Sequence, residues 1–510
     1  MKRCSIAFLV VSMVSVCPLS NASSTLESAA GDLDLSFGVG GRVITDFGAV
    51  DSAQGVVVQR DGKIVVAGIN SYNGGNTAVA LVRYKLDGSL DTSFGSGGRV
   101  LSDLGLPAEV FAVALASDGK IVVAGRVFNN PTYFDWLVAR YNSDGSLDTT
   151  FGSGGWVRTD FGAFDASTAV VIQEDGKIVA SGEADQVFAV ARYNIDGTLD
   201  QKFGTGGKVI IDSFGKGVYA YDLAIQPDGK IVAVGGTFLA SEEDYSLVRL
   251  TAKGALDPMF GSGGKVTTNF FLCRGYRSSD QARAIALQKD GKILVAGLTY
   301  DACGGTEGDF ALARYNSDGS LDSTFGTNGK VTTDFFVGPD GGYDIAMEPN
   351  GKIVVAGTVL QYFAGYKFAV ARYDIDGNLD ATFGEGGKAA AAMGGIEDYA
   401  LDTAVQLDGK IVVVGQSRGD FAVARFESGI PIPNIDSVVV DGKRMIITGR
   451  NFDGGAVLLL NGEEQKTTND PQNPTTVLIA KKAGKKVRSG DRLSVRNSDG
   501  VQSSDFLFAQ

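Results

Sequence analysis

The chain of 510 residues contains no histidine. This absence excludes Ser-His-Asp and Cys-His nucleophile systems and every metal site that is built on imidazole. Basic residues number 46 against 59 acidic ones, which gives a net charge of −13. A nucleic-acid partner requires a basic surface and is therefore not expected. With few enzyme mechanisms left, we predict a protein with no catalytic residues and no cofactor.

Long hydrophobic runs are also absent, apart from one at the N-terminus. Lys2 and Arg3 precede an apolar stretch at residues 6–16, and Ser20-Asn21-Ala22 provides small residues around a cleavage point. The stretch is well short of the ~20 residues that span a bilayer. We therefore predict a cleaved signal peptide at residues 1–22, no membrane span, and a secreted, cell-surface or periplasmic protein.

Cysteine is scarce, with four in the chain. Cys4 and Cys17 lie in the predicted signal peptide, which leaves Cys273 and Cys303 as a pair. In an exported chain such a pair usually forms a disulfide, and we predict one here. Two buried free thiols are the alternative.

Glycine, in contrast, is abundant, and much of it belongs to an internal repeat. Leu-Asp-x-x-Phe-Gly occurs seven times between Leu33 and Leu379, and each copy also contains Gly-Lys-Ile. An apolar stretch then closes each copy on an arginine. The seven arginines are Arg83, Arg140, Arg192, Arg249, Arg314, Arg372 and Arg425. All three sequence markers occur seven times, which indicates seven structural units.

Within one copy, residues 147–193, the periodicity is that of strands. We expect a first strand that ends at Phe161, then strands at 169–173, 177–180 and 188–193. Asp175-Gly176 lies between two β-rich runs, which is a strong hairpin signal. Four short strands per copy with apolar residues on both faces predict a seven-bladed β-propeller at residues 31–428. An open solenoid is the alternative, but it would need polar terminal repeats.

The recurring Leu-Asp-x-x-Phe-Gly, Asp-Gly-Lys-Ile-Val-Val-Ala-Gly and Phe-Ala-Val-Ala-Arg-Tyr segments resemble the delta-60 repeat. This bacterial β-propeller family is of uncharacterised function. The resemblance covers about residues 33–426 and implies a propeller and export, but no activity. Small departures occur at Asn350, at residues 389–392 and at Leu250.

The C-terminal residues have a different composition. Pro431 and Pro433 mark a linker at residues 429–434. Short strands are expected after the linker. Gly-Arg-Asn-Phe, which ends at Phe452, lies among these strands, and Asn497-Ser-Asp-Gly forms the closing turn. These segments resemble the immunoglobulin-like domain that plexins and transcription factors share (IPT/TIG). We therefore predict a small Ig-like β-sandwich at residues 435–510.

The repeated arginine shares a strand face with apolar residues and should point between blades. A buried guanidinium needs a carboxylate partner. The aspartate of Leu-Asp is the obvious candidate, as in Asp148 and Asp200. We predict a structural ring of arginine–aspartate pairs.

A calcium loop is suggested by Asn-x-Asp-Gly-x-x-Asp, as in Asn142, Asp144 and Asp148. Only fragments of the alternating oxygen pattern are present, and the distant glutamate of an EF-hand is missing. A plain β-turn is the better interpretation, with calcium as the alternative, and no metal site is predicted.

Variation in length is confined to the loops of one expected face of the disc, where aromatics outside the repeat also gather. These aromatics are Tyr72, Phe128, Tyr133, Phe238, Tyr276, Tyr300, Tyr362 and Phe363. Exposed aromatics with glycine and asparagine neighbours suit the binding of a protein or a sugar. The alternative is that they pack over the blade ends.

We therefore predict a non-enzymatic binding, adhesion or scaffold protein with a protein or glycan partner outside the cytoplasm. One alternative is a carbohydrate-active enzyme, which would need two carboxylates in one pocket. Acidic residues outside the repeat, such as Glu183, Glu243 and Asp398, are scattered over several copies. A structural cell-surface component is the further alternative.

Overall fold

The computed structural model describes residues 28–509 apart from 73–75, 131–132, 163, 213–216, 240–241, 274–275, 301–307 and 337. Within these residues the chain forms β-strands, and its one helical element is the 3-10 turn η1 (Ala483–Lys485). The predicted all-β class is therefore confirmed. In the described residues no helix is long and apolar enough to cross a membrane.

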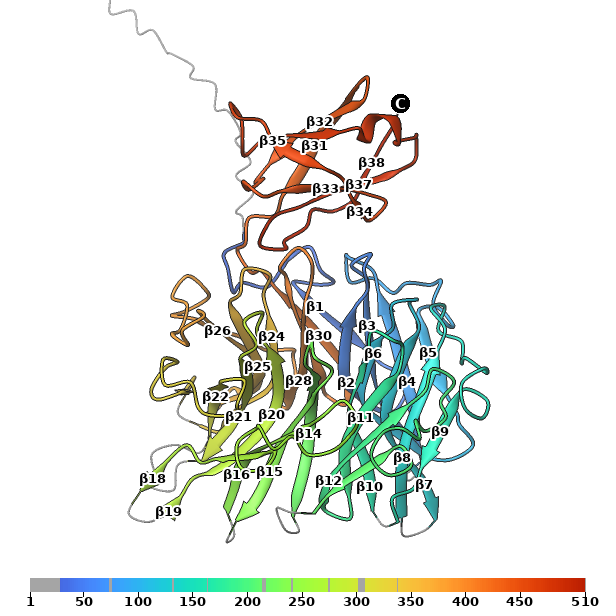
Figure 1. Cartoon of the computed structure of the whole chain (residues 1–510), viewed down its shortest axis with the longest axis vertical. Coiled ribbons are helices and arrows are strands. Elements are labelled where there is room, and N and C mark those ends of the chain that lie inside the picture. Colours follow the sequence, from blue (N-terminus) through green and yellow to red (C-terminus); the bar gives the residue numbers. More distant parts are fainter. Residues whose placement is uncertain are drawn as a thin grey trace, which may run out of the picture.

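Among the described residues, those between 42 and 426 form seven four-stranded antiparallel sheets (Figure 1). The first three contain β2 (Val50–Val58), β3 (Ile64–Tyr72), β4 (Asn76–Tyr84), β5 (Arg99–Ser102); β6 (Ala108–Leu115), β7 (Ile121–Asn130), β8 (Tyr133–Tyr141), β9 (Trp156–Thr159); and β10 (Asp165–Ile172), β11 (Ile178–Ala184), β12 (Val187–Tyr193), β13 (Lys208–Ile211). The next two contain β14 (Val218–Ile225), β15 (Ile231–Leu239), β16 (Glu242–Leu250), β17 (Lys265–Thr268); and β20 (Ser279–Leu287), β21 (Ile293–Tyr300), β22 (Asp309–Tyr315), β23 (Lys330–Thr333). The last two contain β24 (Asp340–Met347), β25 (Ile353–Gln361), β26 (Gly365–Tyr373), β27 (Lys388–Ala391); and β28 (Asp398–Val405), β29 (Ile411–Ser417), β30 (Asp420–Phe426), β1 (Arg42–Thr45).

The sheets are offset by one strand from the sequence repeat. The strand expected to open the copy at residues 147–193 is β9, and it pairs with β8 of the preceding sheet. The grouping of these four strands into one blade was therefore wrong. The physical reason is the connection before β9: Leu147 bridges Tyr141, which folds the chain back so that β9 runs antiparallel to β8.

The same offset brings the two ends of the repeat region together. β1, from the N-terminal end, pairs with β30 over the register Arg42–Ala424 to Thr45–Phe421. Leu33 forms a bridge with Phe426. The last sheet therefore consists of three C-terminal strands and one N-terminal strand.

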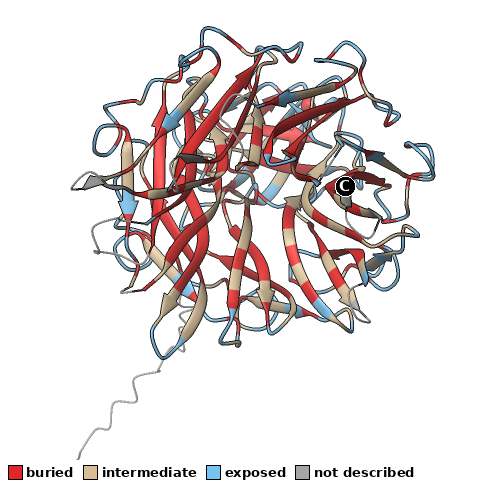
Figure 2. Ribbon diagram, turned by 90° about the horizontal axis from the view of Figure 1, so that it is seen from below, coloured by how far each residue is buried: buried red, intermediate tan, exposed pale blue. Residues whose placement is uncertain are grey.

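The first strand of each sheet, here called the inner strand, contacts the inner strands of its neighbours. β2 contacts both β6 and β28. Apolar clusters fill the boundaries between sheets, and one joins Ile64 and Val66 of β3 to Val412 and Val414 of β29. Figure 2 shows buried strands arranged around a common centre, with exposed residues mainly in the connections. These repeated four-stranded sheets are blades of a β-propeller.

Each sheet boundary also contains a polar unit built from repeated residues. All seven repeat arginines are buried, and each places Nε or Nη2 2.6–2.9 Å from the aspartate of a Leu-Asp segment. In each unit the lysine of Gly-Lys-Ile reaches the same carboxylate, as Lys120 does at 2.7 Å from Asp148. The guanidinium lies over the phenylalanine of the same connection, as in Arg140 over Phe151 at 4.6 Å. Its Nη1 also donates to a backbone carbonyl of the next sheet, Ile195 O in this unit.

This unit controls the ionisation of the aspartate. Burial on its own raises the pKa of the Asp148 carboxyl, but hydrogen bonds from Lys120, Thr150 and Arg140 outweigh burial. The pKa of Asp148 therefore lies well below its usual value. The carboxylate stays charged, and the arginine remains paired at neutral pH.

A second repeated contact joins a buried tyrosine to the outer strand of the preceding sheet. The Tyr193 hydroxyl lies 2.8 Å from Thr159 Oγ1, and three further boundaries contain the same pair. Where the repeat has Leu250 in place of tyrosine, the partner position holds Ile211 and both side chains are buried in one apolar cluster. Both positions change together, so no hydroxyl is left buried alone at this boundary.

The C-terminal residues form two further four-stranded sheets. One contains β31 (Asn434–Asp441), β32 (Arg444–Arg450), β36 (Val477–Lys481) and β35 (Thr467–Asn469). The other contains β34 (Glu463–Glu464), β33 (Val457–Leu460), β37 (Arg492–Arg496) and β38 (Phe506–Leu507). A single buried cluster, which includes Met445, Leu458 and Leu478, lies between them.

This C-terminal unit sits on one end of the propeller, above the Asp-Gly turns (Figure 1). Gln502 N donates to Leu407 O, in the turn between β28 and β29, at 2.8 Å. The hairpin of β18 (Leu272–Cys273) and β19 (Tyr276–Arg277) projects from the opposite end. That opposite end, here called the free face, is the one from which the variable loops emerge.

Candidate functional site

Every inner strand is interrupted by a β-bulge at the same position. A bulge adds one residue to a strand and re-aims its side chain. The bulged residues differ from sheet to sheet: Gln54, Phe111, Thr168, Tyr221, Arg283, Tyr343 and Leu401. Because the inner strands contact one another, these residues lie near one another at the centre of the propeller. Because these residues differ from sheet to sheet, the centre of the propeller has side chains that the repeat does not determine.

Arg283 lies between two tyrosines at this centre. Its guanidinium carbon is 4.1 Å from the ring centroid of Tyr221 on β14 and 5.7 Å from that of Tyr343 on β24. Cations over aromatic faces are held in this way by the ring quadrupole. Nη2 donates to Gln281 Oε1, whereas the buried Nε has no hydrogen-bond partner among the described residues. The guanidinium is positioned by its neighbours, and Arg283 is only half-buried, so part of its side chain can contact another group.

Further tyrosines extend this arrangement toward the free face. Tyr219 stacks on Tyr221 with ring centroids 6.5 Å apart, and Tyr366 contacts Tyr399 at 4.9 Å. Burial raises the pKa of Tyr343, so its hydroxyl stays protonated and can donate. The Arg283 site is defined here as Arg283, Tyr219, Tyr221, Tyr343, Tyr366 and Tyr399.

Two carboxyl groups adjoin the site. Glu243, which is 1% exposed, accepts a hydrogen bond from Gln281 Nε2 at 2.7 Å, and its Oε1 is buried without a partner in the described part of the chain. Burial raises the pKa of Glu243, and it raises that of Glu183 to about 7. Near neutral pH Glu183 can therefore carry a proton and donate a hydrogen bond.

Three aspartates on the inner strands bind backbone amides of the next sheet. Asp222 accepts from Ile285 N at 2.9 Å, and Asp402 accepts from Val56 N at 2.7 Å. Asp344 accepts from Thr403 N at 2.9 Å. Burial and then the Asp402 charge raise the pKa of Asp344 well above its usual value, so the pair shares a proton. These carboxyls hold the sheets together.

The aromatics predicted from the sequence lie in several environments. Tyr300 and Tyr362 are 43% and 46% exposed, and Phe363 is fully exposed at the β25–β26 turn. Phe363 also has φ 66°, a conformation that costs an aromatic residue energy and that is often retained at binding sites. Phe128 packs on Phe134 at 5.3 Å. The side chains of Tyr72, Tyr133, Phe238 and Tyr276 lie outside the described residues.

Other predicted residues can be placed more briefly. Cys303 and the side chain of Cys273 lie outside the described residues, so their disulfide stays a prediction, as does the signal peptide at residues 1–22. In the segment considered for calcium, Asp144 Oδ1 accepts from Ser146 N at 2.9 Å, and Asp148 pairs with Arg140. Both carboxylates thus stabilise a turn and a sheet boundary.

The sequence analysis missed the tyrosines of the Arg283 site. They lie on or beside inner strands, where successive copies share little sequence. A partial signal is the bulged residue three or four positions after the start of each inner-strand register, which is Tyr221, Arg283 and Tyr343 in three successive sheets.

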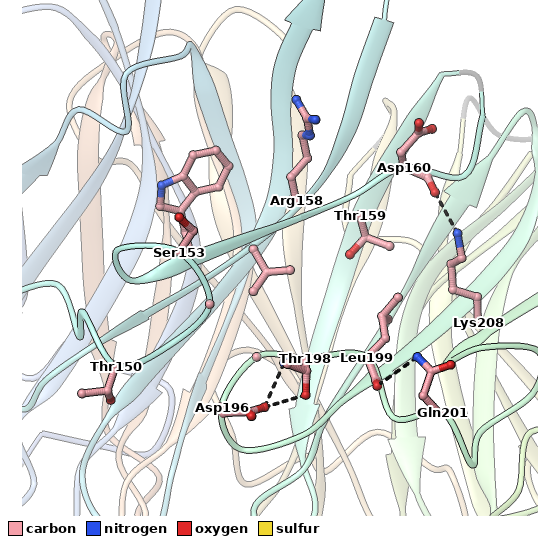
Figure 3. A pocket seen from close by; sticks show the side chains of 14 residues that line it. Thr150, Ser153, Arg158, Thr159, Asp160, Asp196, Thr198, Leu199, Gln201 and Lys208 are labelled. Carbon is pink, nitrogen blue, oxygen red and sulfur yellow. Dashed lines mark hydrogen bonds between the residues drawn. The ribbon is translucent and has the colours of Figure 1, made fainter.

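A groove of about 930 Å³ lies elsewhere, between the outer strands β9 and β13 (Figure 3). Lys208 crosses it and donates to Asp160 O at 2.9 Å. Its lining combines β9 residues, among them Trp156 and Arg158, with repeat connections that include Thr198 and Leu199.

Comparison with known proteins agrees with the fold. The family model described as "Domain of unknown function (DUF5122) beta-propeller" matches seven segments, at residues 59–94, 116–151, 173–203, 226–260, 288–325, 348–383 and 406–429. None of the curated proteins matches the sequence.

The solved structures that this chain matches share little sequence with it. A streptogramin B lyase is 12% identical, with 76% of this chain and 97% of the lyase covered and a TM-score of 0.43. Sqt1 from Chaetomium thermophilum is 14% identical, with 75% and 98% covered and a TM-score of 0.43. A polysaccharide lyase of family PL25, an ulvan lyase, is 12% identical, with 79% and 96% covered and a TM-score of 0.41. With its repeated four-stranded sheets and the seven matched segments, the chain is a β-propeller repeat protein.

Proposed function

We propose that the protein is an exported, non-enzymatic binding protein that holds an acidic glycan at the Arg283 site. The observation that carries this proposal is the guanidinium of Arg283, which lies half-buried between Tyr221 and Tyr343. Tyrosine rings provide apolar faces for sugar rings together with hydroxyl donors. The arginine adds a donor that suits a carboxylate or sulfate.

The position of the site supports binding from outside the molecule. The C-terminal unit covers the opposite end of the propeller, so the free face remains accessible (Figure 1). Tyr362 and Phe363 are exposed on the same side as the variable loops. We infer that they extend the contact surface beyond the centre.

The architecture in this proposal is a seven-bladed ring that is closed by β1, followed by an Ig-like sandwich that acts as a spacer or scaffold module. Pairing of β1 with β30 and contact of β2 with β28 support closure. Two packed four-stranded sheets support the sandwich. A cleaved signal peptide, delivery to the periplasm or cell surface, and absence of a cofactor complete the proposal.

A carbohydrate-active enzyme is the second candidate, because Asp344 and Asp402 form a carboxyl pair at the centre. Both carboxyls already accept backbone amides from neighbouring inner strands, which favours a structural role. Hydrolysis that is abolished by Asp344→Asn while the fold is retained would favour the enzyme.

The proposal is tested on a glycan array with the purified mature chain. Tyr343→Ala should abolish binding to acidic glycans, because it removes one face of the Arg283 clamp. Met259→Ala is the matched control, since Met259 is 76% exposed in a repeat connection away from the site. Binding that survives Tyr343→Ala unchanged, or no binding to any glycan, would refute the proposal.

A further inference from the structure

Three aspartates from separate segments meet at the boundary between the sheets of β8 and β10. Asp135 lies near the start of β8, Asp160 directly follows β9, and Asp165 opens β10. One carboxylate oxygen from each lies within 4.8 Å of the others. Asp135 and Asp165 are buried, whereas Asp160 is exposed. The cluster therefore has a protein-lined side and a side open to water.

The hydrogen bonds around Asp165 leave one oxygen unused. Its Oδ2 accepts from Phe161 N at 2.6 Å. Its Oδ1 is buried and has no hydrogen-bond partner among the residues that the structure describes, although Asp165 is 0% exposed. A buried carboxylate oxygen without a donor is costly, because its lost hydration is not replaced. A cation next to this oxygen would remove that cost.

Two cationic side chains lie beside the cluster. Arg158 Nε lies 3.3 Å from Asp135 Oδ2, and the arginine is 44% exposed. Lys208 Nζ donates to the backbone oxygen of Asp160 at 2.9 Å.

A second boundary repeats the arrangement. Asp46 follows β1, Asp51 lies in β2 and Asp420 begins β30, and their carboxylate oxygens also lie within 4.8 Å of one another. The sequence Thr-Asp-Phe-Gly-Ala-x-Asp occurs at both places, at residues 45–51 and 159–165. The two clusters are therefore equivalent positions of the repeat. At the second one both oxygens of Asp51 accept hydrogen bonds, from Asn70 Nδ2 at 2.6 Å and from Phe47 N at 2.7 Å.

A third boundary shows what balances the charge when one aspartate is replaced. Asn269 directly follows β17, so it corresponds to Asp160. Its Nδ2 donates to Asp244 Oδ1 at 2.9 Å and to Asp280 Oδ2 at 3.1 Å. One positively polarised amide group thus holds the two remaining carboxylates together. Where aspartate takes the place of Asn269, that donor is missing.

The other boundaries differ in how many acids they hold. Ala78 and Ala108 occupy the two buried positions next to Asp103, and Val187 and Val218 occupy them next to Asp212. Buried Asp398 is present where the other two positions hold Lys367 and Ala392. Asp309, Asp334 and Asp340 occupy all three positions at a further boundary, but they are not gathered within 4.8 Å as the two clusters are.

We propose that Asp135, Asp160 and Asp165 bind a calcium ion, and that Asp46, Asp51 and Asp420 bind a second one. Ca²⁺ takes six to eight oxygen ligands in flexible geometry and accepts water among them, which suits three carboxylates open to solvent on one side. Mg²⁺ requires a smaller octahedral cage and is bound more weakly. Each ion joins the outer strand of one sheet to the inner strand of the next.

The test is calorimetric titration of the EDTA-treated mature chain with CaCl₂ and, separately, with MgCl₂. We expect two calcium ions per chain, a rise of the melting temperature with calcium, and weaker uptake of magnesium. Asp165→Asn should reduce the uptake to one calcium ion. Asp103→Asn, at the equivalent position of a boundary without the other acids, should leave the uptake unchanged.

A second variant keeps the test informative if Asp165→Asn fails to fold. Asp160→Asn changes an exposed residue and reproduces the arrangement around Asn269. It should lose one calcium ion and melt, without calcium, at a temperature at least as high as that of the EDTA-treated parent chain. No calcium uptake by the parent chain, or unchanged stoichiometry in Asp160→Asn, would overturn the proposal.

Discussion

Arg425, at the end of the repeat region, donates a hydrogen bond from Nε to Asp34 Oδ2 at 2.7 Å across 391 residues of sequence. The other six repeat arginines make the same bond to an aspartate only eight residues away, as Arg192 does to Asp200. Arg425 also lies over Phe37 at 4.4 Å and donates to Leu86 O at 2.6 Å. One repeated polar unit thus joins the last sheet to the N-terminal segment and to the first sheet.

Arg425→Met should therefore destabilise the protein as much as the same change in the middle of the repeat. It leaves Asp34 buried with Lys410 as its remaining cation, and breaking such a pair costs about 3–5 kcal/mol. Arg192→Met is the matched comparison, because its partners are of the same type. Urea unfolding measures the free energy of unfolding of both variants. An Arg425→Met protein as stable as the parent chain would contradict closure by this unit.

The paired changes at the tyrosine positions predict a non-additive mutant cycle. Tyr193→Phe leaves the Thr159 hydroxyl buried without its partner and should cost about 1–2 kcal/mol. Tyr193→Leu combined with Thr159→Ile recreates the pair of Leu250 and Ile211, and should cost less than the sum of the single changes. Thermal unfolding of the parent chain, Tyr193→Leu, Thr159→Ile and the double variant tests this coupling, which would be refuted by strict additivity.

These repeated contacts are the part of the structure that the sequence predicts best. Each Leu-Asp segment and each arginine recurs, so the pairing of Arg192 with Asp200 follows from charge and burial alone. The assignment of strands to sheets was not predictable in the same way. It depends on the bridge between Leu147 and Tyr141, which no composition or periodicity reveals.

The candidate site was harder to predict for a related reason. Arg283, Tyr221 and Tyr343 come from three copies and converge only because each inner strand bulges at the same place. Within any one copy they read as ordinary strand residues. Their convergence is a property of the sheet arrangement, which the sequence does not state.

Asp222 predicts a pH dependence of stability. Burial raises its folded-state pKa from 3.8 to about 7, so folding favours the protonated form. The stabilisation from this group is complete below about pH 4 and is lost as the pH rises through about 7. Asp222→Asn cannot ionise, so its melting temperature should fall less between pH 5 and pH 8 than that of the parent chain.

Asp222→Asn also loses one acceptor for the amides of Leu223 and Ile285, which lowers its melting temperature at every pH. The informative quantity is therefore the change in melting temperature between pH 5 and pH 8. Asp118→Asn, a change at an exposed turn residue, controls for the altered net charge. Equal slopes in the parent chain and Asp222→Asn would show that Asp222 is ionised throughout the range.

The most direct test of the account is the affinity of the mature chain for uronic acid oligosaccharides and for uncharged hexose oligosaccharides of the same length. Calorimetric titration should give binding of the acidic series, weaker binding of the neutral series, and loss of this preference in Arg283→Gln. Equal affinity of the parent chain and Arg283→Gln for the acidic series, or no binding of either series, would contradict the assignment of the Arg283 site.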